Sequence, residues 1–286
     1  MNFTIGIIFG LVAMFCWGIA DFLVVKVVRS VSVFRAFLWG EVVSLFFYFL
    51  TLLFFFELPP ISGFLLGTIF GCSFLHITAY LALYKSLQVG QVSVVTPISA
   101  SWVVLTVILC LVFLNETLTG AKFAGVALVI CAVVLVSFKW RDMLKLRQMN
   151  LAAGVSYALL ALFAFGVQYA IVDYLVSELS WFLPIFFIKF FSLPLLLIYS
   201  STSGRNVSFP KIAATFIILI GLLEFLAFLG YGLGVNSEYT AIVAPITASS
   251  PIVTIALAKI FFKEAVDINQ RIGIASFLLG LFLLSI

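Results

Sequence analysis

The chain has 286 residues, of which 65% are hydrophobic and only 9% are charged, and its formal net charge is +4. A water-soluble domain covers its surface with charge, so this composition excludes an ordinary soluble protein. The small positive charge is not clustered with stacking aromatic residues in any polar segment, so no nucleic-acid partner is expected.

The apolar residues are gathered into runs of about 20, the length at which a helix spans the hydrocarbon core of a bilayer. The runs are apolar all round, unlike the alternating strands of membrane barrels, so helices are expected. We predict an all-α integral membrane protein with ten transmembrane helices. In chain order these cover 3–26, 34–56, 63–84, 92–114, 120–138, 151–174, 182–200, 211–234, 239–262 and 269–286. A polar break, Lys85 to Gln91, is expected after the third.

An internal repeat relates the two halves of the chain at a constant offset of 148 positions, without gaps. The strongest stretch pairs Thr96–Ser101 with Ala244–Ser249. A single register that includes glycine, proline, serine and glutamate is hard to obtain by chance. Matched pairs along the chain include Gly18 with Gly166, Ser44 with Ser192, Pro97 with Pro245, Thr106 with Thr254, Glu116 with Glu264, and Gly125 with Gly273.

The number of helices in each half sets the symmetry. Five is odd, so the two halves would enter the membrane from opposite sides, which is the inverted-repeat plan of many secondary transporters. We therefore predict a first five-helix repeat over 1–138, a basic linker over 139–150 and a second repeat over 151–286. A transporter uses this symmetry because its inward-open and outward-open states can be the same two conformations exchanged between halves.

Several short motifs resemble a known family. They comprise Trp17-Gly18, Arg35, the run Ala79–Tyr84, Pro97 and Pro245, and the segments Asn115–Thr119 and Lys263-Glu264. In these features the chain resembles the drug/metabolite transporter superfamily, specifically proteins with two EamA-type domains. The resemblance covers both halves and implies transport of small metabolites, such as amino acids, sugars, purines or drugs, often outward. The chain departs from the usual family pattern where Asn115 and Lys263 stand in place of glycine.

Ionisable residues inside apolar runs demand a reason, since each costs at least about 2.5–3.5 kcal/mol at the membrane centre. The repeat pairs Glu41 with Lys189 and His76 with Glu224. His76 and Glu224 lie at the centres of their predicted helices, each on a face with aromatic residues at helical spacing. Residues expected to line a substrate or ion pathway are Trp17, Asp21, Glu41, His76, Tyr80, Gln168, Tyr169, Lys189, Glu224 and Tyr231.

Structural roles compete with these functional ones. Glu41 and Lys189 are equally explained as a buried structural pair, and Asp21, like Asp173, lies close enough to a helix end to reach headgroup water. Tyrosines alone are more often packing residues. Pro97 and Pro245 are expected to kink or break their helices. Glu116 and Glu264 are interpreted as first-turn carboxylates that stabilise helix N-termini.

The four cysteines, Cys16, Cys72, Cys110 and Cys131, form no CxxC pair, and His76 is the single histidine. Neither a disulfide nor a zinc site is therefore expected, and no cofactor is implied. A built-in ATP motor is excluded because the chain has no GxxxxGK[ST] pattern.

Basic residues predict the orientation. Odd-numbered connections carry nearly all of them, whereas even-numbered ones carry only Lys122. The positive-inside rule then places the odd connections in the cytoplasm and both termini outside, whereas members of the family that the chain resembles generally have both termini inside. The residues of the odd connections are Lys26, Arg29, Arg35, Lys85, Lys139, Arg141, Lys145, Arg147, Arg205, Lys211, Lys263 and Arg271.

The sequence favours a secondary transporter of small molecules in the cytoplasmic membrane of a prokaryote, with alternating access and proton coupling through His76 and Glu224. An intramembrane enzyme is the first alternative, but it would need a nucleophile with a base or a metal cluster. A channel is the second, and it would favour a ring of repeated polar groups. Neither a monomer nor a homodimer is favoured, and the substrate and the direction of transport stay open.

Overall fold

The computed structural model describes residues 4–28, 30–55, 58–90, 95, 98–137, 154–262 and 267–286, and all regular structure in these ranges is helical. Pro97, Glu264 and the predicted linker 139–150 lie outside the described residues. The helices are α1 (Ile5–Val27), α2 (Val33–Phe55), α3 (Gly63–Val89), α5 (Trp102–Phe113), α6 (Gly120–Val136), α8 (Val155–Glu178), α9 (Leu183–Ser203), the 3-10 helix η2 (Lys211–Ala213), α10 (Ala214–Ser237), α11 (Thr240–Ala248), α12 (Ser250–Phe262) and α13 (Ile268–Leu284).

Among the described residues, seven helical segments are long and apolar enough to cross a membrane. Three further apolar helices are shorter, at Ile98–Phe113, Gly120–Val136 and Ile268–Leu284. Large apolar side chains such as Phe54, Phe64 and Ile212 are exposed on the outside of the bundle. An apolar surface of this kind suits contact with lipid rather than water.

The predicted polar break after the third helix is wrong over most of its length. Helix α3 continues to Val89, and Gly90 follows it with its N–H bonded to the carbonyl of Ser86. The Lys85 ammonium donates to Gln88 Oε1 at 2.9 Å, three residues along the same helix. A polar final turn can remain helical while it leaves the membrane, because the helix satisfies its own backbone hydrogen bonds.

The ninth predicted helix is divided into α11 and α12. Pro245 lies inside α11, and the interruption comes four residues later at Ser249, whose hydroxyl donates to the Pro245 carbonyl at 2.9 Å. The first half has the same arrangement, because the chain turns at Ser101 before α5 begins at Trp102. Ser101 and Ser249 are 148 positions apart, so both halves interrupt this helix at the matched residue.

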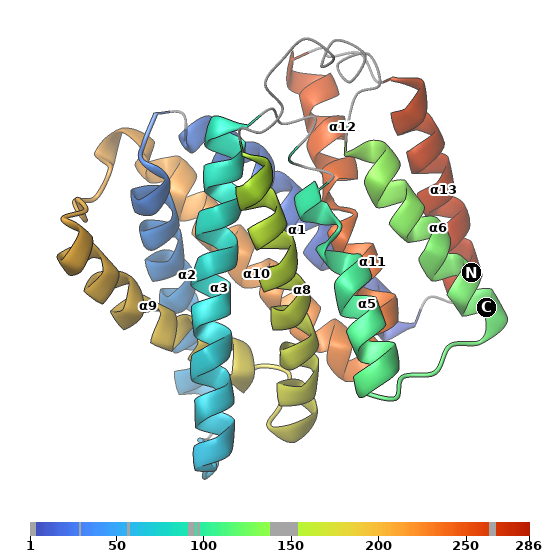
Figure 1. Cartoon of the computed structure of the whole chain (residues 1–286), viewed down its shortest axis with the longest axis horizontal. Coiled ribbons are helices and arrows are strands. Elements are labelled where there is room, and N and C mark those ends of the chain that lie inside the picture. The colour runs from blue at the N-terminus through green and yellow to red at the C-terminus, as the bar shows by residue number, and fades with distance from the viewer. Residues whose placement is uncertain are drawn as a thin grey trace.

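The first helix of each half packs mainly against helices of the other half. Helix α1 packs against α10 and α12, and its counterpart α8 packs against α3 and α5 (Figure 1). The Thr254 hydroxyl donates to the Gly18 carbonyl at 2.9 Å. Its counterpart Thr106 donates to the Gly166 carbonyl at 3.1 Å. The repeat in the sequence thus corresponds to a repeat in the packing.

Small residues allow these helices to approach closely, as is common between membrane helices. A Cβ on Gly18 would lie 2.5 Å from the Cβ of Val253, and one on Gly166 would lie 2.8 Å from the Cβ of Leu105. Figure 1 also shows α6 and α13 side by side at the opposite side of the molecule from α9. There Gly125 and Gly280 bring the two backbones together.

Candidate functional site

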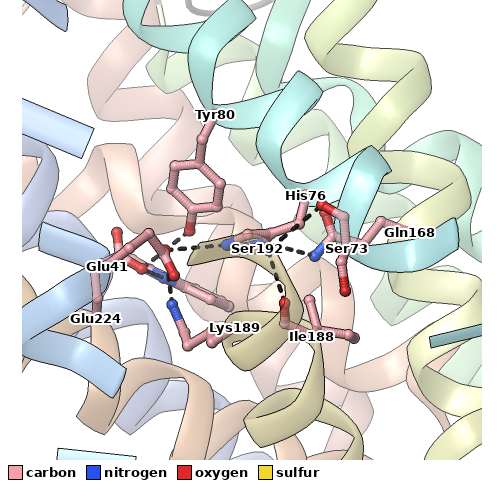
Figure 2. A network of polar contacts seen from close by, with 10 residues as sticks. Glu41, Ser73, His76, Tyr80, Gln168, Ile188, Lys189, Ser192 and Glu224 are labelled. Carbon is pink, nitrogen blue, oxygen red and sulfur yellow. Dashed lines mark hydrogen bonds and ion pairs between the residues drawn. The ribbon is translucent and has the colours of Figure 1, made fainter. Parts of the chain in front are cut away.

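Four buried polar residues from four helices form a connected group, here called the central network: Glu41, His76, Gln168 and Lys189. Figure 2 shows them converging from α2, α3, α8 and α9. Each is at most 4% exposed. The two charged side chains and the histidine lie well inside their helices, away from the ends.

Glu41 and Lys189 form the ionic centre of this network. The Lys189 ammonium lies 2.9 Å from Glu41 Oε1. These residues are 148 positions apart, so the pair joins equivalent sites on α2 and α9. Lys189 also lies over the ring of Phe228, 4.6 Å from its centroid, and this contact is favourable because an aromatic face attracts a cation. The buried pair of Glu41 and Lys189 considered from the sequence is therefore present.

His76 bridges Glu41 and Gln168. Its Nε2 lies 3.0 Å from Glu41 Oε1, and the Gln168 amide nitrogen lies 3.0 Å from its Nδ1. The amide donates to Nδ1, so the proton of a neutral ring is on Nε2 and points at the carboxylate. If the Gln168 amide turned over, its oxygen would accept from a protonated Nδ1. The same three residues can therefore hold the ring neutral or charged.

Glu224 lies beside this network on α10 and has its own donors. The Trp17 indole donates to Glu224 Oε2 at 3.2 Å and the Tyr80 hydroxyl donates to the same oxygen at 3.0 Å. His76 therefore contacts Glu41 and not its repeat partner Glu224. Tyr80 provides the link, since its ring centroid lies 4.7 Å from that of His76.

Aromatic rings surround both carboxylates. Phe228 lies 5.1 Å from Trp17 and 5.8 Å from His76, between centroids. Phe37 stacks on Tyr80 at 5.2 Å. Tyr169 stacks on Trp102 at 4.4 Å and contacts Tyr231 at 4.9 Å. The polar centre is thus enclosed by apolar and π surfaces, which strengthen electrostatic interactions by excluding water.

Several buried polar atoms in or beside the central network have no hydrogen-bond partner among the residues that the structure describes. They are Glu41 Oε2, Ser44 Oγ, Tyr48 Oη and Gln168 Oε1. Glu41, Ser44 and Tyr48 lie at spacings of three and four on α2, so they share one helix face. Buried polar groups are normally satisfied, and an exception calls for an explanation such as a catalytic or binding role.

Two other predicted site residues lie outside the central network. Asp21 is partly buried where α1 meets α12, and it accepts from the Ser250 hydroxyl at 3.3 Å. Tyr231 is fully buried, and its hydroxyl makes no hydrogen bond of good geometry within the described part of the chain. The sequence did not predict roles for Phe37, Ser44 and Tyr48. These residue types commonly pack inside apolar helices, and only the neighbours that they have in the structure connect them with the site.

Glu116 stabilises a helix N-terminus, but not that of the helix that follows it. Its two carboxylate oxygens accept the backbone N–H groups of Thr240 and Ala241, at 2.7 and 2.8 Å, at the start of α11. Thr119 caps α6 instead. The interpretation of Glu116 as a first-turn carboxylate of its own helix is therefore wrong. The loop that carries Glu116 packs against the second half of the chain, so Glu116 stabilises the N-terminus of α11.

Comparison with known proteins places this geometry in context. A family model described as the EamA-like transporter family matches residues 4–138 and 152–286. The uncharacterized protein MJ1333.1 of Methanocaldococcus jannaschii is 38% identical over 63 residues, which is 22% of this chain and 46% of that protein. A solved structure described as "Crystal structure of protein" superimposes with a TM-score of 0.69 at 12% identity, over 98% of this chain and 96% of its own. That likeness concerns the fold alone.

Proposed function

Because the chain belongs to the EamA-like transporter family and is a multi-pass membrane transporter of small molecules, we propose that it is a secondary transporter that works by alternating access at the central network. Its cargo is a small metabolite, such as an amino acid or an amphipathic drug, and the direction is outward. The cell membrane of a prokaryote is the proposed location.

The proposed architecture is ten transmembrane helices in two inverted five-helix repeats, 1–138 and 151–286, joined by the linker 139–150. Two observations support it. The family model matches the chain twice, once in each half, and the Thr106 and Thr254 hydrogen bonds join equivalent positions. The three short apolar helices complete the count if the membrane is thinner around them.

One observation carries the functional proposal: the central network joins both halves near the middle of the helices and leaves buried polar atoms unpartnered. In an inverted repeat the substrate lies near the membrane midplane between the halves. Glu41 Oε2, Ser44 and Tyr48 offer a carboxylate oxygen and two hydroxyls to a polar cargo. The neighbouring rings of Trp17 and Phe228 offer it an apolar face.

The charges of the site favour coupling to protons. With ionised Glu41 and Glu224, charged Lys189 and a neutral His76, the group carries one excess negative charge. An uncompensated charge in the membrane interior is costly, so the site gains by taking up one cation. A proton can serve, on His76 with rotation of the Gln168 amide or on Glu224 beside Tyr80. Its release when the site faces the other side would couple proton movement to transport.

The proposal is tested with purified protein in proteoliposomes, with labelled candidate metabolites. A carrier exchanges labelled for unlabelled solute across the membrane, whereas an enzyme consumes the solute and a channel gives no counterflow. Proton coupling is tested separately by imposing a pH gradient. We expect Glu224→Gln to abolish transport driven by the gradient but to preserve exchange, because exchange needs no net proton movement. Wild-type transport that ignores the gradient would refute the coupling and leave the carrier function intact.

A further inference from the structure

A second group of ionisable side chains lies outside the central network, where α5, α8, α10 and α11 end or begin. Cys110 of α5, Glu116 of the following loop and Asp173 of α8 bring one ligand atom each within 4.8 Å of the others. Cys110 is fully buried, Glu116 is 8% exposed, and Asp173 is partly buried. Here they are called the α5–α8 cluster.

A tyrosine hydroxyl provides independent evidence that this group is incomplete. Tyr231 of α10 is fully buried, yet its hydroxyl makes no hydrogen bond of good geometry with any residue that the structure describes. The hydroxyl lies close to the Thr240 side chain, and the Thr240 hydroxyl donates to Asp173 at 2.8 Å, so Tyr231 borders the cluster. A buried hydroxyl without a partner beside a thiol and two carboxylates is a fourth donor atom without a role in the protein alone.

The negative charges of the cluster are only partly compensated. Glu116 receives the N–H groups of Thr240 and Ala241, while Asp173 accepts a hydrogen bond from the Thr240 hydroxyl at 2.8 Å. Over the ranges that the structure describes, no Lys, Arg or His forms an ion pair with Glu116 or Asp173. Two close carboxylates, one buried and one partly buried, disfavour each other's ionised form when no cation lies between them.

We propose that the α5–α8 cluster is a binding site for a thiophilic divalent cation of the zinc class. A thiolate and carboxylates are ligands that Zn²⁺ accepts in four-coordinate sites. Cys110, Glu116 and Asp173 supply three ligand atoms, and the Tyr231 hydroxyl or a water supplies the fourth. The Cys110 thiol loses its proton to solvent when the metal binds, so binding strengthens as pH rises. The sequence contains no CxxC pair and so predicts no zinc site. The ligands proposed here are far apart in the sequence and meet only in the folded protein.

A metal at this position would connect the two halves of the chain. Cys110 and Glu116 belong to the first half, whereas Asp173 and Tyr231 belong to the second. A bound cation would hold this end of the bundle together. Because its ligands come together only in the folded protein, the cation would stabilise the folded state against heat. Asp173 is partly exposed, so one of the three ligands can be reached from outside the bundle.

The experiment uses full-length protein in detergent, treated with a chelator and then dialysed against Zn²⁺ or Co²⁺. We expect one metal per chain, a higher melting temperature, and a thiolate-to-cobalt charge-transfer band in the near ultraviolet. Cys110→Ser should abolish the band and weaken Zn²⁺ binding by at least about tenfold, because the loss of even an outer-shell partner of a metal typically lowers affinity by that much. Asp173→Asn should weaken binding similarly, whereas the exposed Cys131→Ser is the matched control that should change neither.

Each outcome decides the proposal. Loss of the band and of affinity in Cys110→Ser, with a melting temperature equal to wild type in chelator, supports the site. The proposal is overturned if wild type takes up no metal, or if Cys110→Ser binds as tightly as wild type and keeps the band. Should Cys110→Ser fail to fold, Asp173→Asn answers the same question, because equal affinity in that variant also refutes the site.

Discussion

Lys189 and Glu41 occupy equivalent positions in the two halves of the chain and meet at 2.9 Å in the buried centre of the molecule. Residues related by the repeat therefore carry opposite charges and neutralise each other. Neither side chain is more than 4% exposed. Removing one of them leaves the other as an uncompensated buried charge.

This contact predicts strong non-additivity. Glu41→Gln should lower the free energy of unfolding by about 3–5 kcal/mol, and Lys189→Met should do the same, while the double variant recovers much of the loss. The measurement is a double-mutant cycle by denaturation in detergent. The matched control is the partly exposed pair of Lys122 and Glu238, at 3.7 Å, whose coupling should be about 0–1 kcal/mol. Additive losses at Glu41 and Lys189 would show that the pair contributes nothing as a pair.

The close contacts of α1 with α12 and of α8 with α5 predict matched sensitivity at two glycines. Gly18→Ala and Gly166→Ala should each destabilise the protein by about 1–3 kcal/mol, because the added methyl group forces the helices apart. Gly71→Ala is the control, since an added Cβ there would have no described atom within 4 Å apart from its chain neighbours and its own helix backbone, and alanine favours a helix there. Melting temperatures in one detergent measure all three. An unchanged melting temperature in both Gly18→Ala and Gly166→Ala would contradict this packing.

Glu116 predicts a pH dependence of stability. Burial raises the pKa of Glu116 to about 7. The hydrogen bonds from two backbone N–H groups lower this pKa, whereas repulsion from Asp173 raises it further. A carboxyl whose pKa is higher in the folded state stabilises the protein at low pH, and this stabilisation is lost as pH rises through about 7. The melting temperature of wild type, in chelator, should fall as pH rises from 4.5, the ordinary pKa of the group, to about 7, and level off above that. Glu116→Gln should flatten that fall, and an unaltered slope would exclude Glu116 as its source.

The distribution of basic residues predicts which side of the membrane each connection faces. In a variant with its cysteines replaced by serine, Lys145→Cys lies in the linker outside the described residues and Ser62→Cys lies in the connection before α3. We expect an impermeant thiol reagent to label Ser62→Cys in intact cells and to label Lys145→Cys only after permeabilisation. The reverse pattern would support the orientation that the family resemblance implies.

The sequence by itself determined the helical membrane class, because hydrophobic length and composition are read directly along the chain. The family follows from short motifs and from the family model that matches both halves. It also determined which residues are equivalent, since the constant offset of 148 pairs Glu41 with Lys189 and Thr106 with Thr254. It predicted the end of α3 five residues too early, because the polarity that marks a membrane boundary does not stop a helix.

Only the tertiary structure decided which of the equivalent residues touch. Glu41 meets Lys189, but His76 turns to Glu41 and Gln168, while Glu224 is held by Trp17 and Tyr80. A repeat fixes equivalence along the chain, whereas contact depends on how each helix is rotated against its neighbours. For the same reason the sequence does not show that Cys110, Asp173 and Tyr231 lie near one another, although it does place Tyr231 among the expected pathway residues. They lie on separate helices with no recognisable spacing, and packing alone brings them together.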